Sequence, residues 1–278
     1  LEREFEASYG ELLALSFGGF IAFAAGTLPA GWLGDRWSRR GMLAVYFLGL
    51  GASAVLTGLA TSLVGIAVGL TLIGLFASIY HPIGTAMLVQ GRQKIGRLIG
   101  VNGVFGNMGM AAAALVAGGL SDLFGWRAAF IVPGLVALIT GTVFVALAPR
   151  MVPPAAAAAG GGLGGKRFFL GGLICLAFMT TFAGMIFYAT SIAMPKLFDE
   201  RLDLLGDTLS GVGGLVAAIY AIAAMTQIVV GIMIDRYPIK LLLIAVIGLQ
   251  VPLLLLLAGA EGYWLPLVAL MLMSLVFG

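Results

Sequence analysis

The stretch GWLGDR at residues 31–36 decides the fold, because a related stretch, GIMIDR, recurs at residues 231–236. Each closes a long apolar run with a Gly that is followed four residues later by an Asp-Arg pair, and the copies lie 200 positions apart (231 minus 31). Only 10% of the residues are charged, so a charged turn that repeats after an apolar run is informative. It predicts two related halves.

Composition places the chain in a membrane. Apolar residues occupy 61% of the 278 positions, and the mean hydropathy is +1.12. Soluble domains carry roughly 25% charged residues, so this chain lacks the charge to cover a water-facing surface. A span needs about 20 apolar residues and must be helical, because lipid leaves free backbone groups unsatisfied. We therefore expect an all-α polytopic membrane protein, in which the 42 glycines allow close helix packing.

Nine apolar runs predict the spans, and the last is cut short by the end of the chain. They cover residues 10–33, 42–62, 64–89, 97–120, 128–148, 168–194, 209–234, 239–258 and 263–278. A Pro-, Ala- and Gly-rich stretch predicts a linker over 151–167, between an N-terminal half at 1–150 and a C-terminal half at 168–278. Because the chain opens without Met and stops inside an apolar run, we expect a fragment.

The charges favour one orientation of these spans. If the loop that holds Asp35 and Arg36 faces the cytoplasm, eleven basic residues lie on that side and four on the other. This asymmetry is the one that the positive-inside rule predicts. Of the 12 acidic residues, only Asp35 and Asp235 fall on the basic side. An acid among the basic residues favours a specific role over simple anchoring.

These residues resemble a known family. Gly31, Leu33, Asp35, Arg36, Arg39 and Arg40 are similar to the signature loop of the major facilitator superfamily, with Ser38 where Gly is usual. Gly231, Asp235 and Arg236 resemble its weaker second copy, and GWRAAF at 125–130 resembles the family's turn between helices five and six. The resemblance implies a bundle of two pseudo-symmetric six-helix halves, of which this chain covers helices two to ten.

The resemblance also implies a conformational latch. In the family, the signature loop holds the two halves together on the cytoplasmic face and breaks when the carrier opens inward. Carried over, the latch contains Gly31, Asp35, Arg36, Arg39, Arg40, Gly231, Asp235 and Arg236. A carboxylate facing a helix N-terminus is stabilising, and we expect Asp35, with its fuller basic tail, to be the main latch. Arg39 and Arg40 either take part, bind lipid phosphates or only anchor the topology.

The single histidine, His81, is the strongest candidate inside the membrane. It lies ten residues before Gly91, or about 15 Å along a helix, and ionisable groups at that depth usually serve function. His titrates near neutral pH, which suits proton coupling. Alternatively, His81 is a neutral packing residue and Pro82 only kinks the span. Tyr80-His81-Pro82 is also similar to the fosmidomycin-resistance-like branch of the family.

Other polar residues in the runs are weaker candidates for a substrate or proton pathway. Asn102 and Asn107 lie among glycines, where amides also serve to join helices. Thr181 and Tyr188 lie on the run that corresponds to helix seven. We interpret Tyr220 and Gln227, on the run that corresponds to helix eight, as packing or rim residues.

These observations favour a secondary active transporter that moves a small solute by alternating access and is driven by a proton gradient. A transport-inactive sensor or scaffold on the same fold is the alternative. An enzyme is disfavoured because one histidine cannot supply an acid–base cluster. We expect no cofactor, metal or nucleic acid, since Cys175 is the single cysteine and the net charge is +3. We expect a monomer in contact with membrane lipid, in a bacterial inner membrane.

Overall fold

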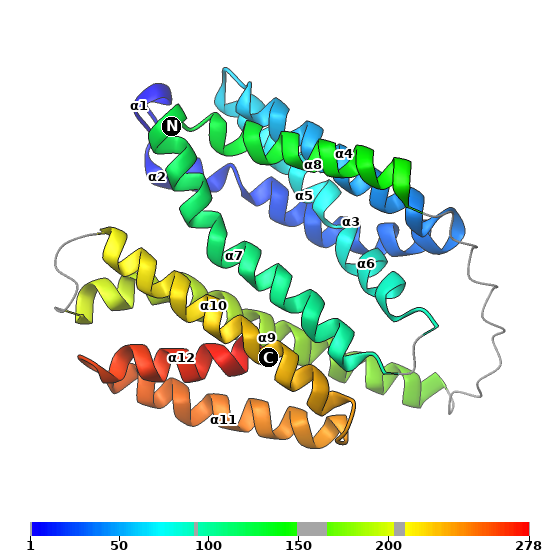
Figure 1. The fold of residues 1–278 in the computed structure, drawn as a ribbon, viewed down its shortest axis with the longest axis vertical. Helices are drawn as coiled ribbons and strands as arrows, with labels where there is room; N and C mark the ends of the chain where they lie inside the picture. The colour runs from blue at the N-terminus through cyan, green and yellow to red at the C-terminus, as the bar shows by residue number, and fades with distance from the viewer. Residues whose placement is uncertain (1, 92–93, 149–165, 203–208, 278) are drawn as a thin grey trace. The chain divides into compact units, whose positions relative to one another are not determined.

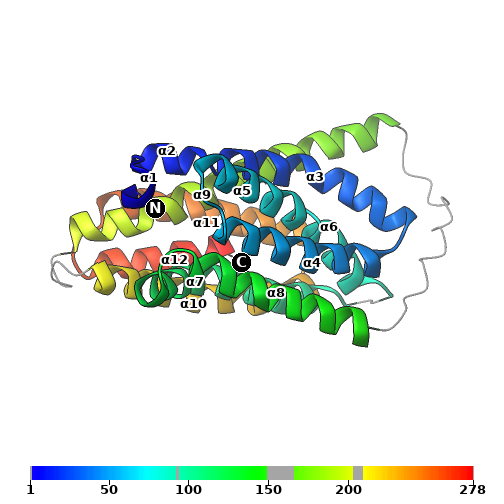
Figure 2. The same cartoon turned by 90° about the horizontal axis from the view of Figure 1, so that it is seen from above.

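A computed structural model describes residues 2–91, 94–148, 166–202 and 209–277. Within those ranges every regular element is an α-helix. The chain divides into two compact units: unit 1 comprises Leu1–Gln90 and Val116–Ala158, and unit 2 comprises Gly91–Leu115 and Ala159–Gly278. Figures 1 and 2 show the helices of both units.

Unit 1 is built around the pairing of two long helices. Its elements are α1 (Glu2–Phe5), α2 (Tyr9–Ala14), α3 (Phe17–Arg36), α4 (Arg39–Gly58), α5 (Leu63–Ala77), α6 (Tyr80–Val89) and α8 (Ala128–Leu147). Helices α4 and α8 lie side by side along most of their length (Figures 1 and 2). Gly51 of α4 allows this, because a Cβ there would lie 2.7 Å from the Gly134 carbonyl oxygen of α8. Helix α5 packs against both α3 and α4.

Unit 2 has its core around the last helix. Its elements are α9 (Lys166–Arg201), α10 (Leu209–Ile234), α11 (Ile239–Gly259), α12 (Trp264–Phe277) and the first part of α7 (Gly96–Phe124). Helix α12 packs against α10, α11 and α9, and Leu265, Leu272 and Phe198 are fully buried there. Side-chain donors also reach neighbouring helices: Gln250 Nε2 donates to the Leu275 carbonyl at 3.2 Å.

Serine caps define where three helices begin. Ser38 has an extended backbone, and its Oγ accepts the Gly41 N–H at 3.0 Å at the start of α4. Ser62 does the same for α5 through the Gly65 N–H at 3.1 Å. Ser8 and Glu11 form a capping box at α2. The departure from the family pattern at Ser38 thus has a local role, because a serine cap satisfies a backbone donor that glycine would leave free.

The helices follow the predicted runs, with informative differences. Eight helical segments of the described chain are long and apolar enough to cross a membrane. The run at 64–89 is divided into α5 and α6 at Ser78–Ile79, four residues before Pro82, which has no N–H to offer the Ser78 carbonyl. Helix α9 continues through Pro195 to Arg201, beyond the predicted end at 194. There Arg201 Nη1 donates to the Ala258 carbonyl of α11 at 2.8 Å.

The compact units do not follow the predicted division at residue 150. Residues 91–115 cluster with unit 2, since the start of α7 contacts the end of α10. The predicted linker lies mostly outside the described residues, and its last two positions, Lys166 and Arg167, already belong to α9. The division into two six-helix halves stays a prediction.

Candidate latch and polar sites

The first charged turn joins three helix ends of unit 1. Arg39 Nη2 donates to Asp35 Oδ1 at 2.9 Å, and Arg39 Nη1 donates to Gln90 Oε1 at 3.3 Å. The Arg39 side chain is 17% exposed, whereas that of Asp35 is 66% exposed. Arg39 therefore links the end of α3, the start of α4 and the residue that follows α6. The Asp35 carboxylate remains open to solvent on its other side.

Arg40 has a separate role from Arg39. Its Nε donates to the Ala148 carbonyl at 3.0 Å, and its Nη2 donates to the Val145 carbonyl at 2.5 Å. These carbonyls lie at the C-terminus of α8, where a helix leaves acceptors unpaired and carries partial negative charge. Arg40 thus caps α8 from α4. Arg36 points elsewhere, with its guanidinium 4.7 Å from the centre of the Trp32 ring.

The second charged turn binds a helix N-terminus within unit 2. Asp235 Oδ1 accepts the Gly96 N–H at 2.9 Å, and Oδ2 accepts the Arg97 N–H at 3.1 Å. These two donors begin α7, where backbone N–H groups are unpaired and the helix carries partial positive charge. The carboxylate of Asp235 therefore joins the end of α10 to the start of α7. Arg236, the next residue, is exposed.

This contact lowers the pKa of Asp235 below its ordinary value of 3.8. The main causes are the backbone N–H groups of Gly96 and then Arg97, and the charge of Lys94 adds to them. Because the bound state has the lower pKa, the contact is fully stabilising above the ordinary pKa. This stabilisation is lost as the pH falls through the lowered pKa of Asp235. At neutral pH the Asp235 carboxylate is therefore ionised, which is the form that accepts the two N–H groups best.

Glycines let the two backbones meet beside Asp235. A Cβ on Gly96 would overlap the Gly231 carbonyl oxygen, and a Cβ on Gly231 would overlap the Gly96 carbonyl oxygen. One turn further along α7, a Cβ on Gly100 would overlap the Gln227 carbonyl oxygen. The close approach of the α7 and α10 backbones therefore requires glycine at position 231 of the repeated motif. Gly31 in the first copy has a looser neighbour, because its Cβ would lie 3.4 Å from Pro82 Cβ.

His81 lies at the break between α5 and α6. Its ring meets Phe23 of α3 edge-on, with centres 5.9 Å apart and planes at 89°, and it meets Tyr80 at 5.9 Å. The His81 carbonyl accepts the hydroxyl of Thr85. Tyr80 in turn packs on Tyr46 of α4, at 5.5 Å between ring centres. Tyr80, His81 and Pro82 therefore stand together against α3 and α4, in unit 1.

The remaining candidates lie in unit 2. Asn102 and Asn107 are half-buried on α7, and Thr181 and Tyr188 are exposed on α9. The Thr181 hydroxyl donates to the Ala177 carbonyl of its own helix at 2.8 Å, as membrane threonines commonly do. Tyr188 packs edge-on to Phe187. The structure does not bring these four residues into one described pocket, and their role in a pathway stays a prediction.

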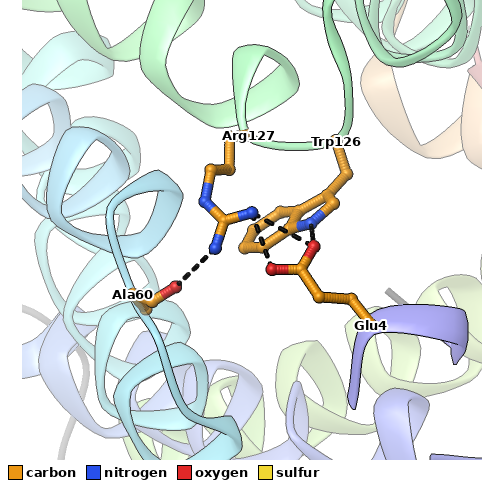
Figure 3. A network of polar contacts seen from close by, with 4 residues as sticks. All are labelled: Glu4, Ala60, Trp126 and Arg127. Carbon is orange, nitrogen blue, oxygen red and sulfur yellow. Dashed lines mark hydrogen bonds and ion pairs between the residues drawn. The ribbon is translucent and has the colours of Figure 1, made fainter. Parts of the chain in front are cut away.

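A polar cluster at the other end of unit 1 was missed by the sequence reasoning (Figure 3). Glu4 accepts the Trp126 indole N–H at 2.6 Å and pairs with Arg127 at 2.7 Å, and Arg127 also donates to the Ala60 carbonyl at 3.4 Å. The hydrogen bond from Trp126, followed by that from Arg127, lowers the pKa of Glu4. The cluster joins α1 to the α4–α5 and α7–α8 turns. The GWRAAF stretch was a signal for one side of it, but nothing in the sequence indicated Glu4.

These features define a class of protein. All described elements are helices, eight segments have membrane length, and charged turns close the apolar helices. The molecule is a multi-pass α-helical membrane protein.

Its family follows from comparison with known proteins. The family model of the Major Facilitator Superfamily matches residues 1–278. The chain therefore belongs to this superfamily of transporters, which are not enzymes.

Two proteins show the range of this similarity. The chain is 30% identical over 151 residues to the tetracenomycin C resistance and export protein of Streptomyces glaucescens, an alignment that covers 52% of this chain and 28% of that protein. Its fold is similar to the crystal structure of the E. coli fucose:proton symporter FucP, with a TM-score of 0.65 and 15% identity. That match covers 96% of this chain and 76% of the symporter chain.

Proposed function

We propose that this chain forms part of a secondary active transporter that moves a small solute across a bacterial inner membrane by alternating access. The observation that carries the mechanism is the Asp235 contact. Two backbone N–H bonds from the start of α7 hold the carboxylate at the end of α10. A carboxylate at a helix N-terminus is stabilising. Because the first N–H groups of a helix have no intrahelical acceptor, breaking these two bonds leaves the bonds within α7 in place.

The latch has unequal copies in this proposal. Asp235 binds the start of α7, whereas Asp35 is paired with Arg39 and has an exposed face. We propose that both turns lie on the cytoplasmic side, and that Asp35 receives a further helix N-terminus when the transporter is closed there. Arg39 then holds Asp35 in place, Arg40 fixes α4 to α8, and Arg36 contacts lipid or solvent.

Proton coupling is proposed to pass through His81. This residue is the single histidine of the chain and stands where the helix is divided between α5 and α6. Broken helices in transporters commonly expose backbone groups beside a binding site. The names of the two similar proteins, a proton symporter and an exporter, support a small-molecule cargo and leave the direction to experiment.

Flux into proteoliposomes tests this function. The complete transporter is reconstituted with an imposed pH gradient, and uptake is measured for fucose and for tetracenomycin C as probes. We expect gradient-driven flux that falls at least tenfold in His81→Ala and in Asp35→Asn, with membrane insertion retained. His81→Ala also abolishes the response to the pH gradient.

The same experiment separates the alternatives. Flux that ignores both the pH gradient and His81→Ala contradicts proton coupling through this residue. Full flux in Asp35→Asn contradicts the latch. Ligand binding without any flux favours the sensor or scaffold on the same fold.

A further inference from the structure

One face of α10 carries the glycine-lined part of the contact with α7, and further along Ala111 of α7 belongs to the same buried cluster as Ala223 and Ala224 of α10. Gln227, Gly231 and Asp235 are spaced four residues apart, which places them on the same side of the helix. Opposite them on α7 lie Gly96, Gly100 and Gly103. This part of the contact therefore has a register: Asp235 lies at the end of α10, Gly231 comes next, and Gln227 is the furthest of the three from that end.

Gln227, the third position of this register, contains a polar atom without a hydrogen-bond partner among the described residues. Gln227 Oε1 is buried and accepts no hydrogen bond from the described residues. Its carboxamide fills the space at Gly103, where a Cβ would overlap it. Gly103 therefore provides a site of the right size for the Gln227 side chain, but no donor. A buried acceptor without a donor makes the packed arrangement less favourable than one in which water reaches it.

The contact thus contains two opposing contributions. Asp235 stabilises the contact by accepting two backbone N–H groups. Gln227 opposes it, because the Oε1 atom loses its hydrogen bond to water when the contact closes. A gate must open and close within one transport cycle, so neither state should dominate. An apolar side chain at 227 would pack against Gly103 without this cost.

We propose that Gln227 is a positioning residue of the α7–α10 gate, and that its unpaired carboxamide oxygen weakens the closed contact so that the gate opens. This inference rests on the proposed function, because it assumes that α7 and α10 separate during transport. Gln227 does not have to touch the solute. It sets the ratio of closed to open molecules.

Electron paramagnetic resonance distance measurement tests this ratio. Spin labels are placed at Ile99→Cys and Tyr237→Cys, both exposed, in a Cys175→Ser background of the complete transporter in liposomes. Gln227→Met, which keeps the length of the side chain and removes its polar group, should raise the closed-to-open ratio about five- to tenfold. That range is the lower end of the penalty for leaving a buried acceptor unpaired. Asp235→Asn should lower the ratio.

Gln250 supplies a matched control. It is a second glutamine of unit 2, but its Nε2 donates to the Leu275 carbonyl at 3.2 Å. Gln250→Met should leave the closed-to-open ratio unchanged and lower the melting temperature instead. If the parent protein is fully closed, Asp235→Asn supplies an opened background, in which Gln227→Met should restore closure.

The outcomes distinguish this inference from the proposed function. An unchanged ratio in Gln227→Met, in both backgrounds, overturns the inference while normal flux leaves the transporter function standing. A ratio that moves equally in Gln227→Met and Gln250→Met also overturns it. Absence of flux together with a single distance that no variant changes is a failure of the proposed function.

Discussion

At the residue scale, the two aspartates of the repeated turn show how one motif serves two contacts. Asp235 accepts two backbone N–H groups at the start of α7, whereas Asp35 pairs with Arg39 four residues away. An exposed ion pair at this spacing is weakly stabilising, so Asp35 retains capacity for another partner. The sequence predicted that both acids were unusual, but not which donors each would meet.

Ser38 gives a prediction at this scale. Its hydroxyl caps α4, so Ser38→Ala should lower the free energy of unfolding of unit 1 by about 1 kcal/mol. Ser38→Gly should lower it by only a few tenths of a kcal/mol. The melting temperature of the purified protein in detergent measures both. Equal losses in the two variants would show that the cap is not the cause.

At the scale of elements, the apolar runs predicted the helices well because the membrane imposes length and helicity on each one. The ends were less predictable. Helix α9 continues beyond Pro195 to Arg201, whose side chain donates to the Ala258 carbonyl of another helix. No local sequence pattern indicates such a partner. The break between α5 and α6 lies where Pro82 leaves the Ser78 carbonyl without an N–H donor. Proline alone does not fix it, however, because Pro29, Pro133, Pro195 and Pro252 lie inside unbroken helices.

Glycine substitutions test the packing of these elements. Gly51→Ala places a Cβ 2.7 Å from the Gly134 carbonyl oxygen and should separate α4 from α8. We expect a clear fall in melting temperature and reduced yield. Gly248→Ala, in the interior of α11 with nothing within 4 Å of the added Cβ, is the matched control. It should be neutral or stabilising by about 0.5–1 kcal/mol, because Ala favours helix over Gly. Equal effects would contradict the close packing of α4 and α8.

At the scale of the whole molecule, the chain is a member of the Major Facilitator Superfamily whose compact units differ from the expected halves. Residues 91–115 cluster with unit 2 and residues 116–158 with unit 1, so α7 contributes to both. A helix shared in this way gives the α7–α10 contact its proposed importance as a gate.

The orientation of the molecule is a prediction at this scale. In a Cys175→Ser background, Tyr237→Cys should react with an impermeant maleimide only after the cytoplasmic side is exposed. Glu261→Cys, at the other end of α11, should react in intact cells. Both positions are exposed in the structure. The opposite labelling pattern would overturn the topology that the eleven-to-four charge asymmetry indicates.

The sequence by itself determined the class of the protein, the positions of its apolar runs and its repeated charged turn. Hydropathy and charge are local properties that lipid and water act on directly, and they can be read along the chain. Only the tertiary structure decided what each charged turn binds, because those partners are backbone groups of helices far away in sequence. The donors to Asp235 are the backbone N–H groups of residues 96 and 97. Almost every residue has such a group, so only the fold decides which of them reaches the Asp235 carboxylate. The repeated turn therefore identified the architecture, whereas packing at Gly96, Gly100 and Gly103 decided which of its copies meets a helix N-terminus.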